Sequence, residues 1–173
     1  NLDAETRRLM VEEIDLDVAN GTLFTGTWLS SAGVADFAAL LRDAAASGND
    51  DSLAAELRRN DRIAVTAERR APKGGGMVTY RVPDIAPTTI AESEFNRFYV
   101  RALCRRVMQQ GSGRLVVYRA KQVMTPRPGS QEKIGTTIDP EAVLNDLRTA
   151  QGIEPALGLP PGPNSGLTVM LAA

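Results

Sequence analysis

Histidine is absent from the 173 residues, and cysteine occurs once, at Cys104. The absence of histidine excludes Ser-His-Asp triads, Cys-His pairs and histidine-ligated zinc within one chain. A single cysteine excludes an intramolecular disulfide, which fits folding in a reducing compartment. The helical pattern around Cys104 predicts a small buried hydrophobic residue rather than a nucleophile.

Long apolar runs and aromatic residues are also scarce. No run of about 18 apolar residues occurs, so no membrane-spanning helix is expected, and the first 20 residues are too acidic for a secretory signal. We therefore expect a soluble protein without a membrane partner, located in the cytoplasm or in an assembled particle such as a virion. The chain begins with Asn1, which indicates either that leading residues are missing or that processing made this end.

What the chain does have is a strong segregation of charge. Residues 1–57 contain 3 basic and 11 acidic side chains, residues 58–133 contain 16 and 6, and residues 134–173 contain 1 and 4. Such asymmetry favours either an anionic partner for the middle segment or contact between oppositely charged faces of neighbouring copies. Neutralisation between the regions of one folded chain is the plainer alternative.

The first 60 residues predict three helices with an acidic surface. The first helix is expected between Asp3 and Gly21, although the alternation over residues 14–18 also permits a strand there. The alanine- and leucine-rich stretch 30–48 and the shorter stretch 51–60 predict two more helices.

From residue 61 the apolar pattern changes from helical spacing to alternation. Strands over residues 62–70 and 77–82 are expected to form a hairpin across a glycine-rich loop. A long amphipathic helix is predicted from about residue 90 to Gln110, with Gly111 as its stop signal.

The C-terminal third begins with the best strand pattern of the sequence, residues 115–123, which nearby prolines end. Asp139 predicts the N-cap of a further helix. Residues 158–166 are rich in proline and glycine and predict a loop. The short apolar run 167–171 is expected to close the chain as a strand, paired either with its own sheet or with a neighbour's edge.

Together these elements predict an α+β fold. A small helical N-terminal lobe precedes a small, mostly antiparallel sheet covered by two helices, with a Pro/Gly-rich loop and a C-terminal strand. We expect an acidic helical lobe over residues 1–60 and an α+β core with an extended C-terminal segment over residues 61–173, with one continuous domain as the alternative.

The best enzymatic candidate is a pattern that resembles the PD-(D/E)xK metal-dependent nucleases. Asp84 follows a proline, Glu92 and Glu94 lie on the predicted long helix, and Lys121 ends a strand. In such nucleases, clustered carboxylates hold a divalent metal and a lysine assists the attacking water. Arg119 stands two positions before the lysine, where an acid is required, which argues against an active nuclease and leaves an inactive relative as an alternative. We expect no catalytic residue, metal or cofactor.

A ladder of arginines is the most distinctive feature of the long helix. Arg97, Arg101 and Arg105 are spaced so that they follow one face, whereas Phe95 and Phe98 lie on another. A solvated basic face, a nucleic-acid contact and a protein interface are the three interpretations. We predict that the ladder is the exposed half of a complementary contact. The predicted partner-binding face consists of Arg69, Arg70, Arg97, Arg101, Arg105 and Arg119.

These observations predict a non-enzymatic structural subunit of a larger multi-copy complex. It would bind copies of itself or other subunits through complementary acidic and basic faces and extended loops, and a virion or capsid-like shell is the most economical setting. The alternatives are a nucleic-acid-binding module that uses the basic segment 58–121, or the inactive nuclease relative.

Overall fold

A computed structural model describes residues 1–127, 129–150, 152–160 and 165–172. The α+β class is confirmed, with helices dominating and two small antiparallel sheets. Within the described ranges, none of the helices combines the length and the apolarity that crossing a bilayer requires.

The three N-terminal helices are confirmed, and the alternative strand at 14–18 is wrong because this stretch lies inside α1. They are α1 (Ala4–Asn20), α2 (Ser31–Ser47) and α3 (Asp50–Leu57). The side chain of Asp3 accepts a hydrogen bond from the backbone N–H of Thr6, which caps the start of α1. Gly21 ends α1 in the left-handed conformation that glycine adopts without strain.

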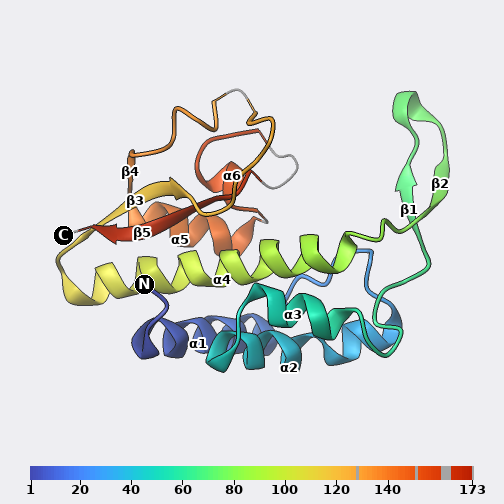
Figure 1. Cartoon of the computed structure of the whole chain (residues 1–173), viewed down its shortest axis with the longest axis horizontal. Helices are drawn as coiled ribbons and strands as arrows, with labels where there is room; N and C mark the ends of the chain where they lie inside the picture. Colours follow the sequence, from blue (N-terminus) through green and yellow to red (C-terminus); the bar gives the residue numbers. More distant parts are fainter. Residues whose placement is uncertain (128, 151, 161–164, 173) are drawn as a thin grey trace.

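The long helix α4 (Ala86–Gln110) begins one turn earlier than predicted. Pro87 lies in its first turn, where a proline removes no helical hydrogen bond. Figure 1 shows α4 crossing the middle of the molecule, with α1, α2 and α3 on one side. The three-stranded sheet and α5 (Pro140–Thr149) lie on its other side. Because both sides of α4 are covered, its central residues have no solvent-exposed face.

The predicted single sheet is two separate sheets. The larger has the order β4–β3–β5, from β3 (Arg114–Arg119), β4 (Thr137–Ile138) and β5 (Leu167–Ala172). The C-terminal strand β5 pairs antiparallel with β3 over its whole length, so the tail folds back on its own chain. The short strand β4 and the one-turn helix α6 (Ile153–Ala156) were not predicted. Part of the predicted Pro/Gly-rich loop, residues 161–164, lies outside the described residues.

The second sheet is the predicted hairpin, here called the arm (residues 66–81). It consists of β1 (Thr66–Arg70), a 3-10 turn (Pro72–Gly74) and β2 (Met77–Arg81). Figure 1 shows the arm extending away from the helices, beyond the start of α4.

One hydrophobic core joins the two regions that the sequence separates at residue 60. Phe37 and Leu41 of α2 belong to the same cluster of buried side chains as Phe98 of α4, Leu115 of β3 and Val169 of β5. A smaller cluster at the base of the arm contains Ala67, Val82 and Ala86.

Candidate functional site

The prediction of an exposed arginine ladder is wrong for two of its three members. The side chains of Arg97 and Arg101 are 3% and 0% exposed, and that of Arg105 is 21% exposed. The physical reason is that α4 is packed on opposite sides by α1 and α5, so the ladder faces other helices instead of solvent.

Arg101 is the centre of a buried charge network between α4 and α1. Its Nη1 and Nη2 atoms donate to the two carboxylate oxygens of Asp17 at 2.7 and 2.9 Å, and its Nε donates to Glu13 at 2.9 Å. The guanidinium carbon also lies 4.8 Å from the ring centroid of Phe98. Hydrogen bonds and charge together compensate for removing these groups from water.

The neighbouring arginines extend this network to other elements. Arg97 donates to Glu94 at 3.2 Å and to the backbone carbonyl of Leu147 on α5 at 3.1 Å. Arg148, also on α5, donates to both carboxylate oxygens of Glu13. Glu13 therefore connects α1, α4 and α5, and the arginines of the ladder form their ion pairs with acidic residues of the same chain.

The pKa values of the two buried glutamates shift in opposite directions, because the arginines outweigh burial at Glu13 but not at Glu94. Burial alone would raise the pKa of Glu13, but hydrogen bonds from Arg148 and Arg101 outweigh it and lower this pKa. For Glu94, burial prevails over the attraction of Arg97 and raises the pKa to about 7. The network thus holds one carboxylate firmly ionised and another close to its titration point near neutral pH.

The remaining predicted face residues lie apart from the ladder. Arg69 and Arg70 are on the arm, where the guanidinium of Arg69 lies 5.4 Å from the ring centroid of Tyr80. Arg119 is half-buried and donates to the Ser165 carbonyl at 3.1 Å and to the Ser130 hydroxyl at 3.2 Å, so it ties two loops together. The structure therefore does not bring the six arginines into one surface.

The acidic surface predicted for residues 1–57 is mostly neutralised within the chain. In the part of the chain that the structure describes, only Asp43 and Asp51 among these acidic side chains lack an ion pair. This result favours the plainer explanation of the segregated charge, neutralisation between the regions of one fold.

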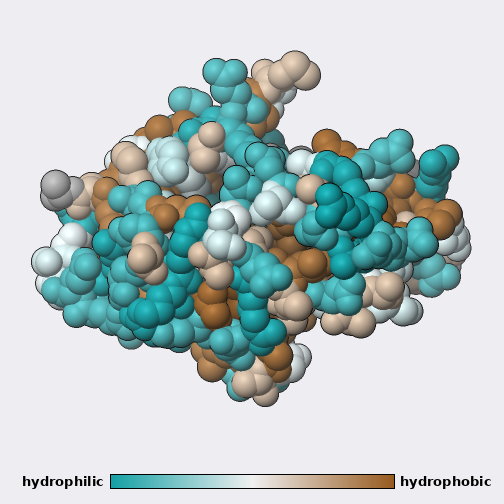
Figure 2. All heavy atoms as spheres, turned by 60° about the horizontal axis from the view of Figure 1, so that its bottom comes forward, coloured by the Kyte–Doolittle hydropathy of each residue, from teal (hydrophilic) through white to brown (hydrophobic). Residues whose placement is uncertain are grey.

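The arm presents both apolar and basic side chains to solvent. Val65 and Ile85 flank it with 79% and 64% exposure, and Met77 and Val78 are 59% and 43% exposed. Figure 2 shows apolar surface beside hydrophilic surface at the end of the molecule that carries the arm. Among described residues, none forms an ion pair with Arg69 or Arg70.

The arm also has unpaired strand edges. The hydrogen bonds from Val82 to Val65 and from Ala71 to Gly76 fix which backbone groups face the partner strand. By alternation, the outward-facing backbone groups belong to Thr66, Glu68 and Arg70 on β1 and to Met77, Thr79 and Arg81 on β2. Its base is held by the Trp28 indole N–H, which donates to the Tyr80 hydroxyl at 2.9 Å.

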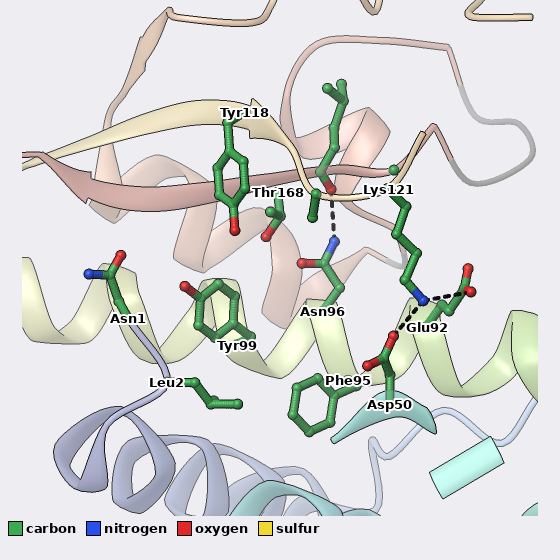
Figure 3. A pocket seen from close by; sticks show the side chains of 13 residues that line it. Asn1, Leu2, Asp50, Glu92, Phe95, Asn96, Tyr99, Tyr118, Lys121 and Thr168 are labelled. Carbon is green, nitrogen blue, oxygen red and sulfur yellow. Dashed lines mark hydrogen bonds and ion pairs between the residues drawn. The ribbon is translucent and has the colours of Figure 1, made fainter. Parts of the chain in front are cut away.

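A pocket of about 300 Å³ lies where α4 separates from β3 and β5. The sequence did not predict it. At one end, the Lys121 ammonium donates to Asp50 at 2.7 Å and to Glu92 at 2.8 Å. Tyr99 and Tyr118 line the other end, with their rings and hydroxyl groups directed into the same space (Figure 3).

The residues that line this pocket show which parts of the predicted nuclease pattern lie together. Glu92 and Lys121 do meet there, but Asp84 is almost fully exposed in the loop before α4 and does not line the pocket. Glu94 faces the buried network instead. In the described ranges, no three side chains of the metal-ligating types are grouped so that they could hold a metal ion. The pattern's elements are therefore not assembled into one site.

Comparisons with protein-family models, with curated proteins and with solved structures found no match for this chain.

Proposed function

We propose that this protein is a non-enzymatic structural subunit of a multi-copy assembly and that it binds neighbouring copies through the arm. The observation that carries the proposal is the arm itself, a two-stranded sheet that extends from the body and exposes apolar side chains. Isolated two-stranded hairpins are marginally stable in water, and a covering surface stabilises them.

Strand edges give the arm a way to bind. Six residues direct their backbone N–H and C=O groups away from the hairpin, and such groups pair readily with an extended segment of another chain. Met77 and Val78 would supply buried apolar contact once a partner covers them. Backbone pairing and apolar burial together support a specific interface.

Charge indicates the kind of surface that the arm would meet. The acidic residues of α1 and the ladder of α4 neutralise each other, whereas Arg69 and Arg70 have no acidic partner among the described residues. A mildly acidic protein surface therefore fits the arm. The virion or capsid-like setting stays a prediction.

Nucleic-acid binding is the second candidate, and the same guanidinium groups favour it. A two-stranded ribbon fits the major groove of duplex DNA, and exposed arginines contact phosphates. Binding of this kind would be steeply salt-dependent. Exposed Met77 and Val78 favour the protein interface, because phosphate contacts do not need apolar side chains.

Hydrogen–deuterium exchange as a function of protein concentration tests the proposal. We expect exchange of the arm's amides to slow as concentration rises, and Met77→Lys to abolish the effect. The matched control is Met108→Lys, which alters another exposed methionine, at the far end of α4. Exchange that is independent of concentration, or that slows only when DNA or RNA is added, contradicts the proposal.

A further inference from the structure

The pocket between α4 and the three-stranded sheet contains hydrogen-bonding groups without partners. Thr168 is 4% exposed and lines the pocket, yet its hydroxyl oxygen is buried with no hydrogen bond among the described residues. Buried polar groups are nearly always satisfied, so an orphaned hydroxyl beside a cavity indicates a partner that enters it.

Three further groups converge on the same space. Asn96 donates from its amide nitrogen to the Leu167 carbonyl at 2.9 Å, which fixes its amide oxygen toward the pocket (Figure 3). The hydroxyl groups of Tyr99 and Tyr118 have no hydrogen-bond partner in the described part of the chain. Tyr118 and Thr168 are cross-strand neighbours in the β3–β5 ladder, so the sheet holds both at fixed positions.

The charged end of the pocket restricts the charge of a ligand. Asp50 and Glu92 already surround the Lys121 ammonium, so this end carries no excess of positive charge to attract a phosphate or a carboxylate. A cationic ligand would have to share the two carboxylates with Lys121. A neutral ligand with several hydroxyl groups can use both kinds of group. The lysine ammonium donates to a ligand hydroxyl, and the carboxylates accept from another hydroxyl of the same molecule.

We propose that this pocket binds a small neutral polyhydroxylated ring, of the monosaccharide or cyclitol class. Ring hydroxyls would satisfy Thr168, Asn96 and the two tyrosines. The apolar faces of Phe95, Tyr99 and Tyr118 would pack against the C–H face of the ring. A volume of about 300 Å³ accommodates such a ring with its hydroxyl groups. This binding is independent of the arm.

Saturation-transfer NMR on the intact chain tests the assignment. The panel comprises neutral monosaccharides and inositol at about 10 mM, which detects even millimolar binding, together with a phosphorylated sugar and an amino sugar. We expect saturation transfer to at least one neutral compound and weaker transfer to its charged counterparts. The absence of transfer to every neutral compound, or stronger transfer to a charged one, overturns the proposal.

Two substitutions separate a ligand contact from a structural role. Thr168→Val keeps the shape but removes the orphaned hydroxyl, so the free protein should melt at a higher temperature while affinity falls about tenfold. Tyr118→Phe should also weaken binding about tenfold without unfolding the protein. Thr66→Val, on the exposed strand β1, is the matched control and should change neither property. Affinity that is unchanged by both pocket substitutions contradicts the assignment.

Discussion

Arg101 and Asp17 form a bidentate ion pair in the protein interior, with nitrogen–oxygen distances of 2.7 and 2.9 Å and almost no exposure of either side chain. The two residues lie 84 positions apart in the sequence. The pair joins α1 to the centre of α4, so it connects the acidic N-terminal segment with the basic middle segment. Much of the charge segregation in this sequence is therefore explained by ion pairs that form within the chain when it folds.

Replacing Arg101 should destabilise the protein strongly. Arg101→Met leaves Asp17 and Glu13 buried with less compensation, and removing one partner of a buried pair typically costs about 3–5 kcal/mol. Urea denaturation followed by circular dichroism measures the loss. The matched control is Arg8→Met, because Arg8 pairs with exposed glutamates, where solvent screens the charges, and its loss should change the stability much less. Equal effects of the two substitutions would contradict the role of the buried network.

Glu94 should make the protein less stable as the pH rises from 5 to 8. Its pKa is about 7 in the folded protein against 4.5 for an ordinary glutamate, because burial disfavours the charged form. Between these values the folded state binds more protons than the unfolded state, so the free energy of unfolding falls by up to about 3 kcal/mol. No histidine titrates in this window.

The measurement is a series of denaturation curves across that pH range. Glu94→Gln retains a hydrogen-bond acceptor for Arg97 but cannot titrate, so its stability should be nearly level between pH 5 and 8. The same downward slope in the Gln variant would show that another group is responsible.

Cys104 should be unreactive in the folded protein. Its side chain is fully buried, and burial, with smaller effects of Asp139 and Glu13, raises the pKa of the thiol to about 12. Since the thiolate is the reactive form, a disulfide reagent such as DTNB should react only as the chain unfolds. Measured at increasing urea concentrations, the rate should follow the unfolding equilibrium. Rapid reaction of the native protein would indicate that α4 opens locally.

The chain's single tryptophan should report the attachment of the arm. Trp28 donates to the Tyr80 hydroxyl at the arm's base, so Tyr80→Phe removes this contact. We expect a red shift of tryptophan fluorescence and faster trypsin cleavage after Arg69, Arg70 and Arg81. Tyr118→Phe, which lies in the pocket, is the control and should leave both signals unchanged. Unaltered cleavage in Tyr80→Phe would mean that the apolar contacts alone anchor the arm.

Local signals in the sequence were sufficient to predict most elements. Asp3 and Asp139 cap the helices where the capping preferences placed them, and Gly21 and Gly111 end helices as expected. These signals act within one helical turn, so the sequence carries them directly. The antiparallel character of the strands was predicted for the same kind of reason, because a short glycine-rich loop joins β1 to β2.

The arrangement of these helices and strands in space could not be predicted from such local signals. Alternation identifies β1 and β2 as strands, and β-branched and aromatic residues identify β3, but neither signal specifies that the first two form a separate sheet. Likewise, the spacing of Arg97 and Arg101 defines a helix face without specifying that α1 and α5 cover it. The pocket depends on contacts between Lys121 and two acids that lie 29 and 71 positions away, and no local pattern carries such information.

Static light scattering over a concentration series tests most directly whether the arm joins copies of this chain. The wild type should rise above the mass of one chain as concentration increases. A variant with Arg70→Glu and Arg81→Glu, both on exposed arm positions, should stay at the single-chain mass under the same conditions. A wild type that remains a single chain at every concentration and salt level, or a variant that associates equally well, would contradict the account.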